Sequence, residues 1–264
     1  MQNLIILYAI VIIINIFLVF SFFVRLVGVE TKRWSTSNSI FQIINLLPRT
    51  IGVFQIPLIT LFTEYAINTN KTVSPLFYQG VIFFNLIGVL IGFTLLPFFL
   101  NSLKETINSI YANDSFKIIF KKNTLKTIIS TFFSGSFNNF FRHSNQLKVK
   151  NKKLFFYNLM ATFFLCSAFP ACVWAGYNLP AYRATIISLV SIIYGAASVI
   201  TILFIDTKLS VITDKTFHNQ ISLSEYKIVL FDCLKGKIIG TLIGVIALPL
   251  LSGSIVYLVS KFLI

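Results

Sequence analysis

A row of polar side chains leads to a single arginine inside a long apolar segment. Between Trp34 and Phe62 the only charged residue is Arg49, which lies about midway. A charge at the centre of a bilayer costs at least ~2.5–3.5 kcal/mol on insertion scales, so this guanidinium needs a partner, a water-filled cavity or an anionic ligand. The polar residues before it are spaced three or four apart, which places them on one face of a helix. These residues are Ser35, Asn38, Gln42 and Asn45.

Two prolines flank Arg49 in the same segment. Pro48 and Pro57 have no backbone N–H, and we expect them to kink or break the helix near the membrane midplane. The polar row and the prolines together predict a lined cavity and not a lipid-facing helix. A structural alternative stays open, in which Arg49 donates to backbone carbonyls that the kinks expose.

The rest of the sequence offers no pattern for covalent chemistry. It holds no nucleophile–base constellation and no glycine-rich phosphate loop, and its three cysteines and two histidines lack metal-ligand spacing. We therefore expect no enzyme activity, no catalytic residue, no cofactor and no bound metal. None of the eight acidic residues lies at the centre of an apolar run, so an anion from outside the protein is the expected partner of Arg49.

The composition indicates a polytopic helical membrane protein. Hydrophobic residues make up 56% of the 264 residues and charged residues 11%, well below the ~25% charged residues of soluble domains. Several apolar runs reach the ~20 residues needed to cross ~30 Å of hydrocarbon. We predict one transmembrane domain (1–264), an all-α bundle of about six transmembrane helices whose second span is kinked or broken by proline. The predicted spans are 3–24, 34–62, 78–100, 154–178, 183–205 and 238–260.

The distribution of basic residues predicts the orientation. Most of the 22 lysines and arginines lie in the segments 25–33, 101–153 and 206–237. The positive-inside rule places these segments in the cytoplasm and both termini outside the cell. The 101–153 segment mixes apolar residues with lysines, so we expect cytoplasmic amphipathic helices that lie on anionic inner-leaflet lipids. The net charge of +14 is thus explained by the membrane, and no nucleic-acid partner is predicted.

Small residues in the last predicted span favour close helix packing. Gly236, Gly240 and Gly244 recur every four residues, a spacing that lets two helix backbones approach. A hinge for alternating access is the alternative interpretation of these glycines. No internal repeat is visible in the sequence, although the prolines of spans two, three, four and six leave a three-plus-three arrangement open.

Several short motifs carry a family resemblance. The first is Arg25-Leu-Val-Gly28-Val-Glu-Thr31-Lys-Arg33, followed by Arg49-Thr50 and by Gln55-Ile-Pro57-Leu58. Two later motifs are Asp206-Thr-Lys-Leu209 and Glu225-Tyr226. Together they resemble the Amj family, the alternate lipid II flippases of bacterial cell-wall synthesis. The sequence departs from the family pattern at Gly52 and Thr60.

The resemblance implies a bacterial plasma-membrane protein that moves lipid II, an undecaprenyl-pyrophosphate with a disaccharide-pentapeptide, from the inner to the outer leaflet. It also implies roles in cell-wall biogenesis and cell shape, with proteins of cell-wall synthesis as partners. The expected substrate-binding residues are Arg25, Arg33, Asn38, Gln42, Asn45, Arg49 and Gln55, and the expected structural or gating residues are Gly28, Pro48, Pro57, Gly240 and Gly244. Two alternatives stay open: a small-molecule or anion transporter, and a non-transporting scaffold of the cell-wall machinery.

Overall fold

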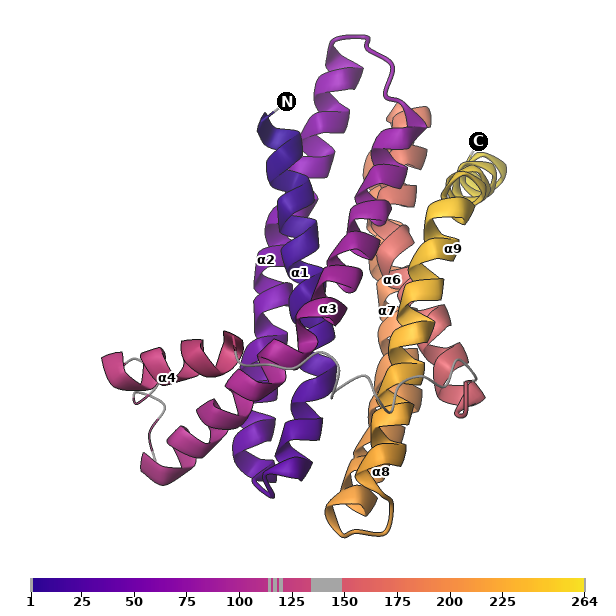
Figure 1. Cartoon of the computed structure of the whole chain (residues 1–264). Coiled ribbons are helices and arrows are strands. Elements are labelled where there is room, and N and C mark those ends of the chain that lie inside the picture. Colours follow the sequence, from indigo (N-terminus) through magenta and orange to yellow (C-terminus); the bar gives the residue numbers. More distant parts are fainter. Residues whose placement is uncertain (1, 114, 116–117, 119–120, 134–148, 264) are drawn as a thin grey trace.

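The protein is a bundle of long helices (Figure 1). The computed structural model describes residues 2–113, 115, 118, 121–133 and 149–263, and these residues form helices and turns without any strand. Six helices in this part of the chain are long and apolar enough to cross a membrane, which confirms the predicted all-α class and number of spans. The helices are α1 (Gln2–Glu30), α2 (Trp34–Asn68), α3 (Pro75–Asn113), α6 (Lys152–Asn178), the joined α7 (Arg183–Ile200) and α8 (Thr207–Phe217), and α9 (Leu223–Leu263).

The helices extend well beyond the predicted spans. The segment 206–237, expected as a loop, is helical except for the turn at 218–222, because α8 continues α7 and α9 begins early. The junction between α7 and α8 is a π-helical segment, Thr201–Asp206. The helices of this segment therefore continue into polar sequence, beyond the apolar runs that marked the predicted spans. In α2 the helix is continuous through Pro48 and Pro57, and the expected kink stays a prediction.

The basic segment 101–153 contains one further described helix. This helix, α4 (Lys122–Phe133), lies at the side of the bundle, beside the last part of α3 and crosswise to the long helices (Figure 1). Its Phe132 ring lies 5.9 Å from the ring of Phe98, while Leu125 and Ile129 are exposed. Residues 134–148 lie outside the described part of the chain. The position of α4 on the inner membrane surface stays a prediction.

The helix directions divide the bundle into two units of inverted orientation. In one unit α1 packs on both α2 and α3, and in the other α6 packs on both α7 and α9. The α2–α3 connection lies at the end of the bundle that carries both termini, whereas the α8–α9 connection lies at the opposite end (Figure 1). Inverted three-helix units of this kind are a common architecture of membrane transporters. The three-plus-three arrangement that the sequence left open is therefore present in the fold.

A matching hydrogen bond closes the helical hairpin in each unit. The hydroxyls of Thr63 and Tyr78 lie 2.9 Å apart across the α2–α3 hairpin, and those of Thr213 and Tyr226 lie 2.8 Å apart across the α8–α9 hairpin. Both tyrosines are fully buried. Each hydroxyl pair satisfies polar groups that have no access to water, and it joins the two helices of its hairpin.

Paired glycines bring the first and third helix of each unit into backbone contact. A Cβ atom at Gly88 would lie 2.6 Å from the Ile12 carbonyl oxygen, and one at Gly240 would lie 2.5 Å from the Leu159 carbonyl oxygen. Real Cβ atoms do not approach this closely, so α3 meets α1 and α9 meets α6 only where the side chain is absent. Gly88 and Gly92 lie ten and fourteen residues after Tyr78. Gly236 and Gly240 lie ten and fourteen residues after Tyr226.

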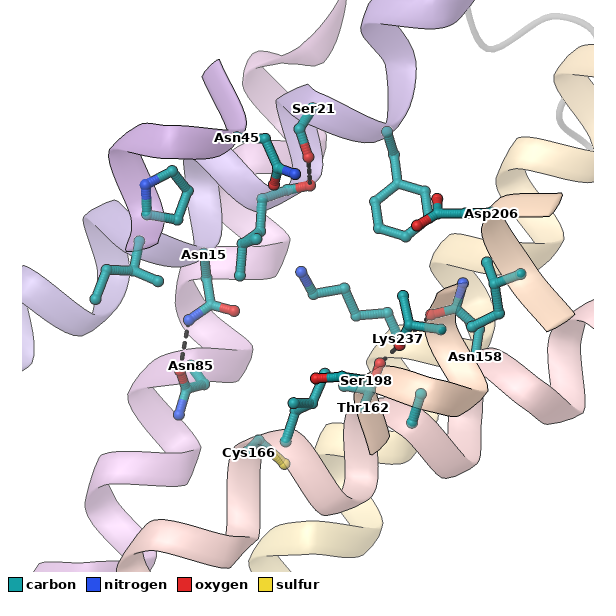
Figure 2. Close-up of a pocket in the computed structure, with 18 of the residues that line it drawn as sticks. Asn15, Ser21, Asn45, Asn85, Asn158, Thr162, Cys166, Ser198, Asp206 and Lys237 are labelled. Atoms are coloured by element: carbon teal, nitrogen blue, oxygen red, sulfur yellow. Dashed lines mark hydrogen bonds between the residues drawn. The ribbon is translucent and has the colours of Figure 1, made fainter. Parts of the chain in front are cut away.

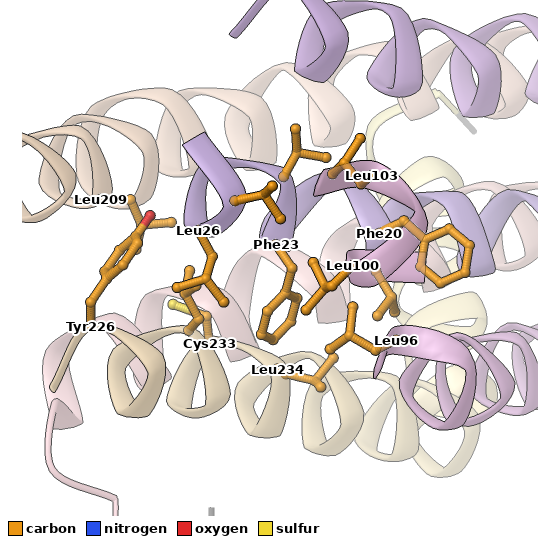
Figure 3. Packing of buried hydrophobic residues seen from close by; sticks show 14 of the residues in the cluster. Phe20, Phe23, Leu26, Leu96, Leu100, Leu103, Leu209, Tyr226, Cys233 and Leu234 are labelled. Atoms are coloured by element: carbon orange, nitrogen blue, oxygen red, sulfur yellow. The ribbon is translucent and has the colours of Figure 1, made fainter. Parts of the chain in front are cut away.

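An apolar core joins the two units near the end opposite the termini (Figure 3). Phe23 of α1 packs against Phe231 of α9 with ring centres 5.6 Å apart. Leu26, Leu100 and Leu234 surround this contact from α1, α3 and α9. The core lies beside the polar region described below and supports its walls.

Replacing Gly240 with valine is expected to destabilise the protein, because the new side chain must push α9 away from the α6 backbone. Such overpacking costs ~1–3 kcal/mol, so the unfolding midpoint of the detergent-purified protein should fall by several degrees. Gly253→Val is the matched control, since Gly253 lies on the same helix beside open space. Equal melting temperatures for the two variants would contradict the close α6–α9 contact.

Candidate substrate cavity

A cavity of about 480 Å³ lies between the two inverted units (Figure 2). Its walls come from α1, α2 and α3 on one side, and from α6, α7, α8, α9 and the π-helical segment on the other. Its volume is within the ~300–1,000 Å³ typical of ligand pockets. The lining includes many polar side chains although the helices are apolar. These are Asn15, Ser21, Arg25, Asn45, Gln55, Asn85, Asn158, Thr162, Tyr194, Ser198, Thr201, Asp206, Lys237 and Thr241.

Arg25 lies near the end of α1, toward the end of the bundle that is opposite the termini and that carries the basic segments (the basic end). Its Nη2 donates to Asp206 Oδ1 at 3.1 Å, which joins α1 to the π-helical segment of the other unit. The guanidinium carbon lies 4.6 Å from the ring centre of Phe41 on α2. The side chain is 11% exposed, and its Nη1 has no hydrogen-bond partner in the described part of the chain. One donor of this buried cation is therefore unused.

Lys237 is the second cation among the described residues that line the cavity. It lies on α9 and is only 6% exposed. Figure 2 shows its side chain extending from α9 into the space between Asn15 and Asp206. Among the residues that the structure describes, no acceptor lies within hydrogen-bond or ion-pair distance of its ammonium group. The nearest acid on its own helix, Asp232, accepts from the backbone N–H groups at positions 150 and 151 and from Lys235.

Two asparagines occupy matching places in the two units. In α1, Asn15 lies three residues after Ile12, whose carbonyl contacts Gly88. In α6, Asn158 lies three residues after Phe155, whose carbonyl contacts Gly236. Asn15 donates to the side chain of Asn85 on α3. The close helix contacts thus hold an amide from each unit at the cavity wall.

The π-helical segment supplies four lining residues, Thr201, Ile202, Ile205 and Asp206. A π-turn is wider than an α-turn and is frequent at functional sites. Here the wider turn presents two pairs of neighbouring residues to one cavity.

Contacts between the units close the bundle at the end that carries the termini. Glu64 of α2 and Arg183 of α7 form an ion pair at 3.5 Å. The Tyr177 hydroxyl donates to the Lys71 carbonyl at 3.3 Å and accepts from the Val73 N–H at 3.2 Å, tying α6 to the α2–α3 connection. A second apolar cluster, drawn from both units, fills the bundle between these contacts and the cavity.

The structure brings three of the sequence-predicted binding residues to the cavity: Arg25, Asn45 and Gln55. Arg33 lies elsewhere, donating to Asn108 Oδ1 at 2.7 Å with its guanidinium 4.1 Å from the Tyr111 ring. Two more, Asn38 and Gln42, are exposed and do not line the cavity. Arg49 is part of α2, but its side chain lies outside the described part of the structure. Its contact with a ligand stays a prediction.

The predicted structural residues lie at helix contacts and in the cavity wall. A Cβ atom at Gly28 would lie 2.7 Å from the side chain of Ser37, where α1 meets the start of α2. One at Gly244 would lie 2.8 Å from the Cys166 sulfur. Pro48 lines the cavity, whereas Pro57 lies inside α2 without reaching it. A gating role for these residues, and for Gly240, stays a prediction.

Sequence reasoning did not select Lys237 as a binding residue. The predicted last span began one residue later, so Lys237 was placed in a cytoplasmic loop. Its neighbours Gly236 and Gly240 carried a usable signal, because glycines at this spacing predict a close helix–helix contact and so extend the last span to include Lys237. No cluster of three metal-ligating side chains occurs within the described residues.

The family model for Amj, described as alternate to MurJ, matches residues 10–259. The match spans both inverted units and every residue that lines the cavity. Comparison with curated proteins and with solved structures gave no match.

Breaking the ion pair between Arg25 and Asp206 is expected to lower stability in the absence of ligand. Asp206→Asn should cost about 1 kcal/mol, since the carboxylate is 43% exposed and solvent screens the pair. The double variant Arg25→Asp/Asp206→Arg should regain part of the lost melting temperature in a double-mutant cycle. Asp214→Asn, at an exposed acid on α8, is the control. Additive effects of the two charge changes would contradict the pairing.

Proposed function

Because this chain belongs to the Amj family of alternates to MurJ, we propose that it moves lipid II from the inner to the outer leaflet of the bacterial plasma membrane. The proposal makes it a multi-pass transporter and not an enzyme. Its substrate carries a pyrophosphate, two sugars and a peptide on a polyprenyl chain. Anionic inner-leaflet lipids and proteins of cell-wall synthesis complete the proposed partners.

The observation that carries the proposal is a polar, cationic cavity inside an apolar bundle. Arg25 retains an unused donor there, and guanidinium groups bind phosphate oxygens through paired hydrogen bonds. Asn45 and Gln55 suit the hydroxyl groups of a sugar. A disaccharide-pentapeptide is larger than the cavity, so the proposed occupant is the pyrophosphate with the sugar next to it. The polyprenyl chain remains among the membrane lipids.

The inverted units support a transport mechanism. In inverted-repeat transporters, one unit moves against the other around a binding site at their interface. Ion pairs between the units lie at both ends of this bundle: Glu64 with Arg183 at the end of the termini, and Arg25 with Asp206 toward the basic end. Transfer would separate the first pair as the cavity opens to the outer leaflet. A transporter requires this separation, whereas a scaffold does not.

The orientation can be tested with cysteines in two exposed turns. Thr72→Cys lies in the α2–α3 connection, and Gln220→Cys lies in the α8–α9 connection. If the basic segments face the cytoplasm, a membrane-impermeant maleimide should label position 72 in intact cells and position 220 only after permeabilisation. The wild type, whose three cysteines are buried or half-buried, reports background labelling. The reverse pattern would refute the proposed orientation.

The function is tested by rescue of a strain depleted of its essential lipid II flippase. Wild-type protein should restore growth and expose lipid II at the outer leaflet. Arg25→Gln should lose rescue at equal membrane abundance, whereas Arg33→Gln should retain it because Arg33 lies outside the cavity. Failure of the wild type to expose lipid II would refute the flippase proposal.

The same assay tests the prediction for Arg49. Arg49→Gln should reduce rescue if its guanidinium contacts the substrate during transfer. Full rescue by a well-expressed Arg49→Gln variant would remove Arg49 from the mechanism. Full rescue by Arg25→Gln as well would show that transfer of lipid II does not depend on these two arginines.

A further inference from the structure

Lys237 has a charge that the described protein does not neutralise. Its ammonium group lies in the cavity among amides, hydroxyls and apolar side chains. Asp206, the one acid among the lining residues, pairs with Arg25. A buried charge without a partner is costly, and in membrane proteins such groups mark the path of a substrate or ion.

The arrangement around Lys237 indicates what would neutralise it. A lysine from one unit and an arginine from the other line the same cavity, and the arginine Nη1 is unused. An anion with several oxygens spread over two centres can accept from both cations at once. Asn158 lines the same cavity, and its Nδ2 has no hydrogen-bond partner in the described part of the chain, so it can donate to a remaining oxygen. A diphosphate group has this distribution of acceptors, whereas a single carboxylate has only two oxygens on one carbon.

We infer that Lys237 and the Arg25 Nη1 group form a diphosphate-binding site that holds the two phosphates of a polyprenyl diphosphate between the inverted units. The inference rests on the proposed function and names the contact through which the cavity recognises its lipid. Because the two cations belong to different units, a bound diphosphate connects the units directly. Binding of the lipid is thereby linked to the relative position of the two units.

The site is tested by binding to the full-length protein in nanodiscs, with undecaprenyl diphosphate as the ligand. Lys237→Gln should weaken binding roughly tenfold or more, the scale of one lost charge-assisted hydrogen bond. Lys237→Arg should retain most of the affinity because it keeps the charge. Lys215→Gln, which removes the same charge from an exposed position on α8, should bind as the wild type does. Unchanged affinity in Lys237→Gln would overturn the inference.

Two further ligands identify the source of the diphosphate. Undecaprenol, which lacks phosphate, should bind the wild type and Lys237→Gln equally weakly. Inorganic pyrophosphate should compete poorly, since it lacks the lipid chain; competition at the affinity of the lipid would overturn the assignment to a lipid. The binding assay does not depend on transport. Loss of binding in Lys237→Gln together with failed rescue by the wild type would keep the site and refute the flippase function.

Thermal unfolding separates this role from a structural one. Without ligand, Lys237→Gln should melt at or above the wild-type temperature, because it removes an unpaired buried charge. With undecaprenyl diphosphate, the wild type should gain stability and Lys237→Gln should lose most of that gain. A fall in the ligand-free melting temperature of Lys237→Gln, with the ligand-induced gain intact, would show that Lys237 pairs within the protein and would overturn the site.

Discussion

The backbone contact between the first and third helix of each unit is the constraint on which the rest of the bundle depends. Lipid offers apolar helices as favourable an environment as their neighbours do, so helix association relies on close packing. Gly88 and Gly92 provide it on α1, and Gly236 and Gly240 provide it on α6. These contacts fix α3 and α9, while α2 and α7 pack mainly on α1 and α6. The polar cavity forms in the space between the two units.

The few acidic residues explain why the cavity is cationic. Glu30, at the end of α1, pairs with Lys104 of α3 and Lys227 of α9. Asp232 is fully buried and holds the start of α6 through two backbone N–H groups. Acids therefore join helices near the basic end of the bundle. Among the described lining residues Asp206 is the one acid, and it pairs with Arg25, one of the two cations described there.

Sequence periodicity was sufficient for the fold class and for part of the cavity. Apolar runs of membrane length identify six helices, and three- and four-residue spacing places Asn45 on the α2 face that lines the cavity. No sequence pattern distinguishes Lys237, Asn15 and Asn158, because each is a lone polar residue within or beside an apolar run. Their common location depends on how the two units pack, which no single helix encodes. The inverted arrangement was also hidden, since the shared pattern is only a tyrosine followed by two glycines.

The π-helical segment at Thr201–Asp206 sets the rotational phase between α7 and α8. Successive residues of an α-helix differ by ~100° around its axis, so loss of one residue here would rotate all of α8 by that amount. Such a rotation would carry Asp206 away from Arg25 and would also turn Thr213 away from Tyr226, at the far end of the helix. A substitution in this segment alters one side chain, whereas a change in its length would disturb both the cavity wall and the distant hairpin. Across homologous chains, the positions of this segment other than Asp206 should therefore vary in residue type far more readily than the segment varies in length.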